Sequence, residues 1–217
     1  MTDDEALFTA QREAMIEEHL MRRGVRDVAV LDAFAAVPRH RFMLPATRQF
    51  AYEDHAMPIG HDQTISQPYV VAETLRHARI QPGQRVLDVG TGSGYQAALL
   101  AELGAEVHTV ERIPALLERA LEALRATGYG DRVTGHLADG YAGLPEHAPY
   151  DAIVVAAAPP HLPPALLAQL SGGGRLVAPI GDLHQTLEVW TNGPNGPVRE
   201  ALFPVAYVPL VPGIEGS

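Results

Sequence analysis

The sequence has no cysteine and few basic residues. Without a thiol, disulfides, thiolate zinc sites and cysteine nucleophiles are all excluded. The 16 basic residues face 26 acidic ones, which gives a formal net charge of −10. Proteins that bind a nucleic-acid backbone need clustered Lys and Arg to displace counterions, whereas the arginines at 22–23, 39 and 41 are isolated. The composition therefore argues against a nucleic-acid substrate.

Long apolar runs are also absent. No stretch reaches the roughly 18 apolar residues typical of a membrane span, and Met1-Thr-Asp-Asp-Glu5 lacks the features of a signal peptide. We therefore expect a cytoplasmic monomer with no membrane association. With 217 residues and 47% hydrophobic content, the chain is long enough for one sizeable core. We expect a single domain, with a helical or irregular region (1–80) ahead of a cofactor-binding core (81–217).

From residue 84 onward, strand and helix patterns alternate. Strands are predicted at 85–89, 106–110, 132–137, 151–156 and 174–179, and helices at 94–103, 113–127 and 163–170. After residue 180 the helical patterns stop, and two strands (186–191 and 198–208) flank the turn-rich segment 192–197. Alternating units give a mostly parallel sheet covered on both faces. The sequence thus predicts a Rossmann-like, doubly wound α/β fold that ends in an antiparallel hairpin.

The region before residue 80 has a different pattern. Helices are predicted at 4–22, at 26–36 and at 67–78, with Gly24 ending the first and Pro68 in the first turn of the third. The segment 46–66 shows no clear period and is predicted to be irregular. Ser66 is a natural N-cap for the helix that follows it. The fold should therefore carry an N-terminal helical extension.

A glycine-rich loop follows the first predicted strand of the core, in Val86-Leu-Asp-Val-Gly-Thr-Gly-Ser-Gly-Tyr95. Strand, glycine loop and helix form a nucleotide-cofactor layout. A dinucleotide fingerprint has a glycine at its sixth position, where this sequence has Tyr95. The spacing instead favours S-adenosylmethionine (SAM), whose methionyl carboxylate would meet backbone N–H groups of the loop at a helix N-terminus.

Two acids follow the next two strands. Glu111 comes about 20 residues after the loop, where an acid accepts hydrogen bonds from both ribose hydroxyls of a nucleoside. The alternative role for Glu111 is a helix cap or first-turn acid ahead of Pro114. Asp139-Gly140 would meet the adenine amino group, or form an ordinary Asp-Gly turn. Both readings stay open for each acid.

Few other residues suggest catalysis. No histidine cluster has metal-ligand spacing along the chain, no metal is expected, and no serine lies in a nucleophile elbow. A methyl transfer to a carboxylate fits this scarcity, because a carboxyl group of pKa near 4 is already ionised at pH 7. The protein then needs only to align the reacting atoms. Thr64-Ile-Ser-Gln-Pro-Tyr69 supplies hydroxyls and amides for that purpose.

The motifs together resemble the bacterial and archaeal protein-L-isoaspartate O-methyltransferases. The specific part is Ile59-Gly-His-Asp-Gln-Thr-Ile-Ser-Gln-Pro-Tyr-Val-Val71, which is similar to the family signature ahead of the SAM domain. Further similarities are Val37–Phe42, Leu87–Gln96, Val110–Ile113, Asp139-Gly140, Ala148–Ile153, Gly172–Gly181 and Tyr207–Leu210. The resemblance covers nearly the whole chain.

This resemblance implies an enzyme of protein repair. Such enzymes methylate the α-carboxylate of L-isoaspartyl residues, and more weakly of D-aspartyl residues, in damaged proteins and peptides, turning SAM into S-adenosyl-L-homocysteine. The ester then collapses through a succinimide toward normal aspartate. Ser66 is implied to be catalytic, holding the acceptor carboxylate. The resemblance implies cofactor contacts for Gln63, Thr64, Ile65, Ser66, Gly90, Thr91, Gly92, Glu111, Arg112, Asp139 and Gly140, and places Val71 and Val211 near the peptide or cofactor.

The sequence departs from the family pattern at two positions. Asp62 stands where the family usually has glycine, and Ala138 replaces a frequent glycine. Asp62 would place a negative charge near an anionic acceptor unless its side chain turns outward. Two other functions are compatible with the SAM motifs alone: methylation of a small molecule or RNA, and SAM binding without activity. The first gives no reason for the 59–71 segment, and the intact Ser66 and Glu111 argue against the second.

The predicted C-terminal hairpin contains Asn192-Gly193 and Asn195-Gly196. Such pairs form succinimides readily, because glycine does not hinder ring closure. We hypothesise that the chain damages and methylates itself there if the hairpin tip is mobile.

Overall fold

A seven-stranded sheet forms the centre of the computed structural model, which describes residues 3–216. The strand order is β5-β4-β3-β6-β7-β8-β9, parallel from β5 to β7 and antiparallel through β8 and β9. The strands are β3 (Arg85–Val89), β4 (Glu106–Glu111), β5 (Val133–Leu137), β6 (Tyr150–Val155), β7 (Leu170–Ile180), β8 (Gln185–Gly193) and β9 (Gly196–Val205). The predicted Rossmann-like sheet with its C-terminal hairpin is confirmed.

Helices and loops cover both faces of the sheet, as the apolar strands require. The helices α3 (Pro68–Ala78), α4 (Tyr95–Glu102) and α5 (Pro114–Ala126) pack on one face, against Val86 and Val107. Helix α6 (Pro164–Ala168) packs on the other face, against Leu87 and Val89. Residue 170, predicted to end this last helix, instead begins β7. Because strand side chains alternate, the central strands β3, β4, β6 and β7 supply both cores.

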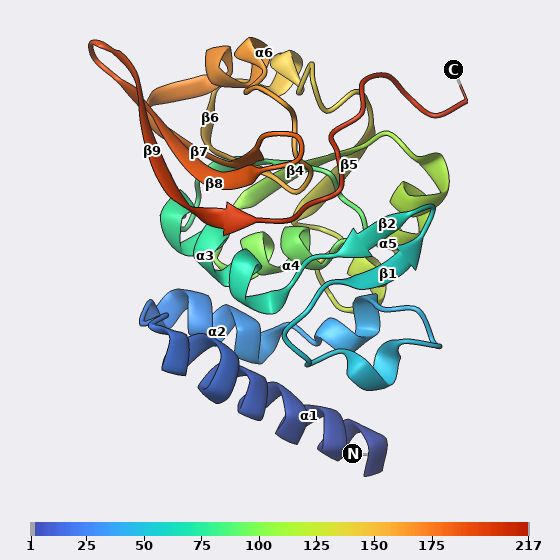
Figure 1. Ribbon diagram of the computed structural model, residues 1–217. Coiled ribbons are helices and arrows are strands. Elements are labelled where there is room, and N and C mark those ends of the chain that lie inside the picture. Colours follow the sequence, from blue (N-terminus) through green and yellow to red (C-terminus); the bar gives the residue numbers. More distant parts are fainter. Residues whose placement is uncertain (1–2, 217) are drawn as a thin grey trace.

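The N-terminal helices form an outer layer against α3 and α4 (Figure 1). The predicted helix 4–22 is α-helical over α1 (Asp3–Met15), then widens into a π turn (Ile16–Leu20) and tightens into a 3₁₀ turn (Met21–Arg23). It ends at Gly24, as expected, in left-handed backbone with φ 96°. Helix α2 (Val28–Ala36) follows, then the 3₁₀ turns Arg39–Phe42 and Arg48–Phe50. No described helix is both long and apolar enough for a membrane crossing.

The segment predicted to be irregular contains a small hairpin. Strands β1 (Met57–Gly60) and β2 (Gln63–Ile65) pair antiparallel, so the prediction for 46–66 is wrong in its second half. The turn between them places His61 and Asp62 in left-handed backbone, with φ of 54° and 55°. The hairpin delivers the chain to Ser66 at the start of α3. The division of the chain near residue 80 stays a prediction.

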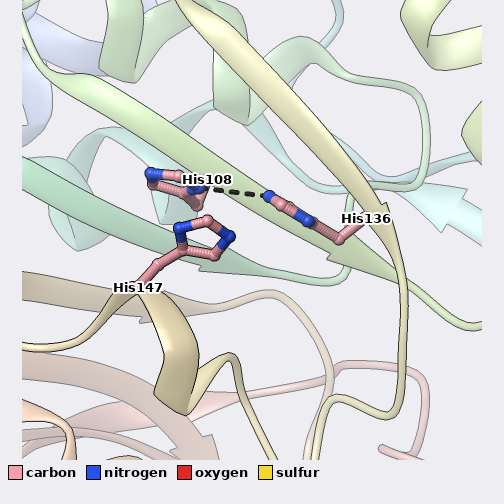
Figure 2. Close-up of side chains that lie close together, drawn as sticks. All are labelled: His108, His136 and His147. Atoms are coloured by element: carbon pink, nitrogen blue, oxygen red, sulfur yellow. Dashed lines mark hydrogen bonds between the residues drawn. The ribbon is translucent and has the colours of Figure 1, made fainter.

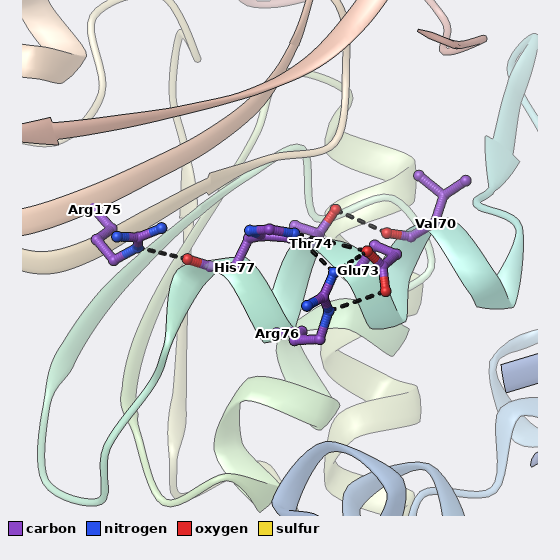
Figure 3. Close-up of polar contacts among 6 residues, drawn as sticks. All are labelled: Val70, Glu73, Thr74, Arg76, His77 and Arg175. Atoms are coloured by element: carbon purple, nitrogen blue, oxygen red, sulfur yellow. Dashed lines mark hydrogen bonds and ion pairs between the residues drawn. The ribbon is translucent and has the colours of Figure 1, made fainter. Parts of the chain in front are cut away.

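Polar contacts fix α3 against the sheet (Figure 3). The Arg175 Nε on β7 donates to the backbone carbonyl of His77 at 2.6 Å. The buried Glu73 carboxylate accepts from Arg76 Nε at 3.0 Å. Burial alone would raise the pKa of Glu73, but hydrogen bonds from His77 and Arg76 outweigh it and lower the pKa. The bond from Arg175 thus ties the C-terminal end of α3 to the sheet, while the Glu73–Arg76 pair lies within the helix.

Ser66 does not cap α3. Gln67 occupies the N-cap position without a capping hydrogen bond from its own side chain, Pro68 begins the helix, and the first-turn N–H of Tyr69 donates to Asp54 Oδ1 at 3.1 Å. The N-cap interpretation of Ser66 is therefore wrong. The reason is that Pro68 has no N–H to be capped and fixes the start of the helix one residue later than Ser66 requires.

The hairpin of β8 and β9 projects from the body of the molecule (Figure 1) and exposes one of its two Asn-Gly pairs. Asn192 is held in the strand, where its Nδ2 donates to the carbonyls of Leu170 and Ser171 at 3.1 and 3.2 Å. Asn195 lies exposed in the turn, ahead of Gly196 at φ 106°. The Asn192 side chain is thus restrained by the neighbouring strand, whereas Asn195 lies in an exposed turn.

We expect deamidation on ageing at Asn195, and much less at Asn192, because ring closure needs a mobile amide and a mobile following N–H. Peptide mapping by mass spectrometry after incubation at alkaline pH measures both sites within one sample. Asn192 serves as the internal control. Equal deamidation of the two, or none at Asn195, would contradict the expectation.

Candidate active site

The glycine loop turns sharply at the carboxyl end of β3. Gly90, Gly92 and Gly94 have φ of 97°, 52° and 86°, a conformation that side chains strongly disfavour. Gly94 occupies the N-cap position of α4. The loop therefore presents bare backbone at a helix start, as the sequence predicted.

Glu111, at the end of β4, ties this loop to the start of α5. Its Oε2 accepts from the Gly92 N–H at 2.9 Å, and its Oε1 accepts from the N–H groups of Arg112 and Ile113 at 2.8 and 3.0 Å. The carboxylate is buried, and Ile113 rather than Glu111 occupies the N-cap position. A carboxylate has about four acceptor positions, so one remains for a hydroxyl of a bound nucleoside.

A buried chain of polar groups lies behind the loop. The Asp88 carboxylate accepts from Gln96 Nε2 and from Thr109 Oγ1, each at 2.8 Å. Because Thr109 spends its only proton on Asp88, the Thr91 hydroxyl donates to Thr109 Oγ1 at 2.7 Å. Burial raises the pKa of Asp88 to about 6. These hydrogen bonds orient the side chains of Thr91 and Gln96, and both residues line the cavity described next.

A cavity of about 840 Å³, its open mouth included, lies beyond the carboxyl ends of β3 and β4. Its wall contains twelve of the residues singled out in the sequence: Gln63, Thr64, Ile65, Ser66, Val71, Gly90, Thr91, Gly92, Glu111, Arg112, Gly140 and Val211. The remaining one, Asp139, is not in the wall. Its Oδ1 accepts from the Tyr141 N–H at 2.9 Å, which is the turn geometry left open above.

A second cavity of about 1000 Å³ adjoins the first, and Thr64 and Ser66 line both. Its other walls include Gln67, Val70 and Tyr207. The buried Tyr207 hydroxyl lies near Ser66 and Thr74, and burial raises the pKa of Tyr207 to about 12. Tyr207 therefore stays a neutral donor at pH 7. Asp62 is exposed and lines neither cavity, so its charge turns outward.

The buried side chain of Arg39 fixes the backbone at Ser66. Its Nη2 donates to the Ser66 carbonyl and its Nε to the Ala51 carbonyl, each at 2.8 Å. The guanidinium also lies 5.0 Å from the ring centre of Tyr95, the first residue of α4. Burial lowers the pKa of Arg39 to about 10, so it is charged at neutral pH.

Sequence reasoning missed part of the cavity wall. Ser93, Tyr95, Gln96, Ala156, Ala157 and Pro209 line it in addition to the expected residues. The signal for Ala156 was its place just after β6, because ligands of such sheets lie beyond the carboxyl ends of the strands. For Tyr95 the signal was that it replaces the glycine at the sixth position of the dinucleotide fingerprint.

The donor set of the first cavity fits SAM: bare N–H groups, a carboxylate at the end of β4, and apolar walls from Val89, Ile113 and Leu210. A methyl group on Gly140 would come within 2.8 Å of Val89 Cγ1, so a side chain there would force Val89 to shift. Fold and site together define a SAM-dependent methyltransferase.

Comparison with known proteins places the chain more narrowly. The family model for protein-L-isoaspartate(D-aspartate) O-methyltransferase matches residues 10–215. The chain belongs to this family and is an enzyme that uses SAM as methyl donor. The family match gives no support to the alternative of an inactive module or of a small-molecule or RNA methyltransferase.

Individual relatives agree. The chain is 53% identical over 198 residues to a protein-L-isoaspartate O-methyltransferase of Gloeobacter violaceus, covering 90% of this chain and 96% of that one. It is 49% identical to protein-L-isoaspartate O-methyltransferase 1 of Rhodopseudomonas palustris, covering 100% and 89%. A Plasmodium falciparum protein-L-isoaspartate O-methyltransferase, solved with S-adenosyl-L-homocysteine, superimposes with a TM-score of 0.82 at 29% identity over 92% of this chain and 98% of that one.

Replacing Glu111 with alanine should weaken SAM binding by about 10- to 100-fold, because hydrogen bonds to a charged group contribute about 1.5–3 kcal/mol. The change also releases the Gly92 N–H that shapes the loop. Isothermal titration calorimetry with SAM measures the affinity. The matched control is Glu118→Ala, an exposed acid on α5. Unchanged affinity in Glu111→Ala would refute the ribose role.

Proposed function

We propose that Ser66 holds the α-carboxylate of an L-isoaspartyl residue, or more weakly of a D-aspartyl residue, while it is methylated. One observation carries this proposal: Ser66 lies in the wall shared by the two cavities. The first cavity holds the cofactor in this proposal, and the second receives the damaged peptide. An acceptor at Ser66 is then within reach of both.

The chemistry asks for alignment rather than proton transfer. When bound, SAM supplies a methyl group attached to a positively charged sulfur. A carboxylate oxygen can attack the methyl carbon directly, and the sulfur leaves with the bonding electrons. The acceptor carboxylate is ionised at pH 7 and needs no base. The Ser66 hydroxyl donates a hydrogen bond to the oxygen that does not react, and Tyr207 supplies a second neutral donor nearby. Two oriented donors reduce the freedom of the carboxylate, which lowers the barrier to attack.

The second cavity has an acid in its wall whose charge is paired within the protein. Asp54 in its wall pairs with Arg23 Nη1 at 2.6 Å and accepts from Gln67 Nε2 at 2.9 Å and from the Tyr69 N–H at 3.1 Å. Its charge is thus compensated by groups of the protein. The paired carboxylate of Asp54 therefore repels a substrate anion less than an unpaired carboxylate would.

Gln63, Thr64, Ile65, Gly90, Thr91, Gly92 and Arg112 are proposed to contact SAM by their place in the wall. For Asp139 the adenine contact stays a prediction. Val71 and Val211 are proposed to face the peptide or the cofactor. The monomeric state, the cytoplasmic location and the absence of nucleic-acid and membrane partners also remain predictions.

The specificity is tested with two peptides that differ only in one linkage, isoaspartyl or aspartyl. We expect base-labile methyl incorporation from labelled SAM into the isoaspartyl peptide and none into its aspartyl twin. Base lability identifies a methyl ester rather than an N-methyl group. Equal labelling of both peptides would refute the proposed acceptor.

Replacing Ser66 with alanine should lower kcat by about 10- to 100-fold, the loss expected for a hydrogen bond to a charged group. SAM affinity should change much less, since the Ser66 hydroxyl is proposed to bind the acceptor carboxylate rather than the cofactor. Ser171→Ala, on β7, is the control. A matching fall in SAM affinity would mean that Ser66 serves the cofactor instead.

A further inference from the structure

Three histidines gather on the sheet face that carries α6, outside both cavities (Figure 2). His108 lies on β4, His136 on the edge strand β5, and His147 on the 3₁₀ turn Pro145–His147. One ring nitrogen from each lies within 4.8 Å of the others. Spacing along the chain gave no sign of this cluster, because folding brings together three separate segments.

We propose that His108, His136 and His147 form a binding site for a divalent transition-metal ion, Zn²⁺ in the first place. Three imidazole nitrogens and one water make a tetrahedral zinc site. Imidazole also suits Ni²⁺, Co²⁺ and Cu²⁺, whereas Mg²⁺ and Ca²⁺ prefer oxygen ligands.

The distance between the first two ligands supports the site. His108 Nδ1 lies 3.1 Å from His136 Nε2. In a tetrahedral site with Zn–N bonds of 2.0–2.1 Å, two ligand nitrogens lie about 3.3 Å apart. A slight widening of this pair therefore admits an ion in place of the shared proton.

The far side of His108 is arranged as in known metal sites. Its Nε2 lies 3.5 Å from Glu106 Oε1. Ligating histidines usually give their other N–H to a carboxylate, which fixes the tautomer. With the proton on Nε2, the lone pair of Nδ1 points into the cluster.

The third ligand must move. The rings of His147 and His108 stack at 4.3 Å between centres, 26° from parallel, and a stacked ring does not aim its lone pair at a shared ion. His147 is only half-buried and lies on a single turn, so its ring is not enclosed.

One cationic side chain, Arg85, lies close to the three histidines. Its Nη1 donates to the His147 carbonyl, and its Nε lies 3.5 Å from Glu106 Oε1. Glu106 offsets that charge.

A metal ion here would clamp the turn at 145–147 to β4 and β5. The segment between His136 and His147 contains Gly140, which lines the first cavity. The ion would therefore hold one wall of that cavity. This role is independent of the chemistry at Ser66.

Calorimetric titration with ZnCl₂ tests the site, on the full chain first stripped with EDTA and dialysed. We expect one Zn²⁺ per chain, at least tenfold weaker binding in His136→Gln and in His147→Gln, and no response to Mg²⁺. His161→Gln and His184→Gln change exposed histidines elsewhere and are the matched controls. No Zn²⁺ binding by the unaltered chain, or the same affinity after His147→Gln, overturns the proposal.

Thermal unfolding provides a second readout that separates a metal site from simple ring packing. Zn²⁺ should raise the melting temperature of the unaltered chain, since a ligand that binds only the folded state stabilises it. At the same Zn²⁺ concentration, the rise in melting temperature should be clearly smaller for His147→Gln, which binds the ion more weakly. Should Zn²⁺ shift neither protein while His147→Gln melts lower, the imidazoles serve packing alone and the proposal fails.

Discussion

The buried charge of Arg39 is the constraint on which the site depends. A charge removed from water is costly unless the protein replaces the lost hydration. Here the Ala51 and Ser66 carbonyls and the ring of Tyr95 replace part of it, while the buried Nη1 of Arg39 has no hydrogen-bond partner among the described residues. These groups come from the N-terminal region, from the segment ahead of α3, and from the start of α4. Since each must stay in place to solvate the same cation, the three segments are fixed relative to one another.

This arrangement joins two half-sites. One half consists of the glycine loop and Glu111. It is built from strand ends and backbone N–H groups, and many SAM-binding proteins have a half-site of this kind. Ser66 and its neighbours form the other half, and their support is α3 with its buried Glu73 and its bond from Arg175. Tyr95 belongs to both: it lines the first cavity and packs on Phe34 and Phe42 of the N-terminal region.

The sequence was most informative where a pattern repeats. The strands of the core were predicted to within one or two residues at most ends, because apolar runs, glycines and helix periods recur there. The hairpin β1–β2 was missed, since its strands are only four and three residues long and its turn uses His61 and Asp62 rather than glycine. Ser66 was wrongly read as a cap, because spacing cannot say which of two adjacent residues begins a helix.

Contacts across the fold were out of reach of the sequence. Nothing in the spacing says that Arg39 reaches the Ser66 carbonyl, 27 residues away, or that Tyr207 closes the second cavity. Tyr95, at the sixth position of the dinucleotide fingerprint, is a clear example. In the sequence it served only to argue against a dinucleotide cofactor, because that fingerprint has glycine there. In the structure it is the aromatic surface on which the buried guanidinium rests.

The central claim is that one residue, Ser66, forms the boundary between cofactor and acceptor. A crystal structure of the chain with S-adenosyl-L-homocysteine and an isoaspartyl peptide tests it most directly. The account predicts the cofactor product in the first cavity, the peptide in the second, and an α-carboxylate oxygen within hydrogen-bond distance of Ser66 Oγ. A peptide carboxylate bound away from Ser66, with the second cavity empty, would contradict it.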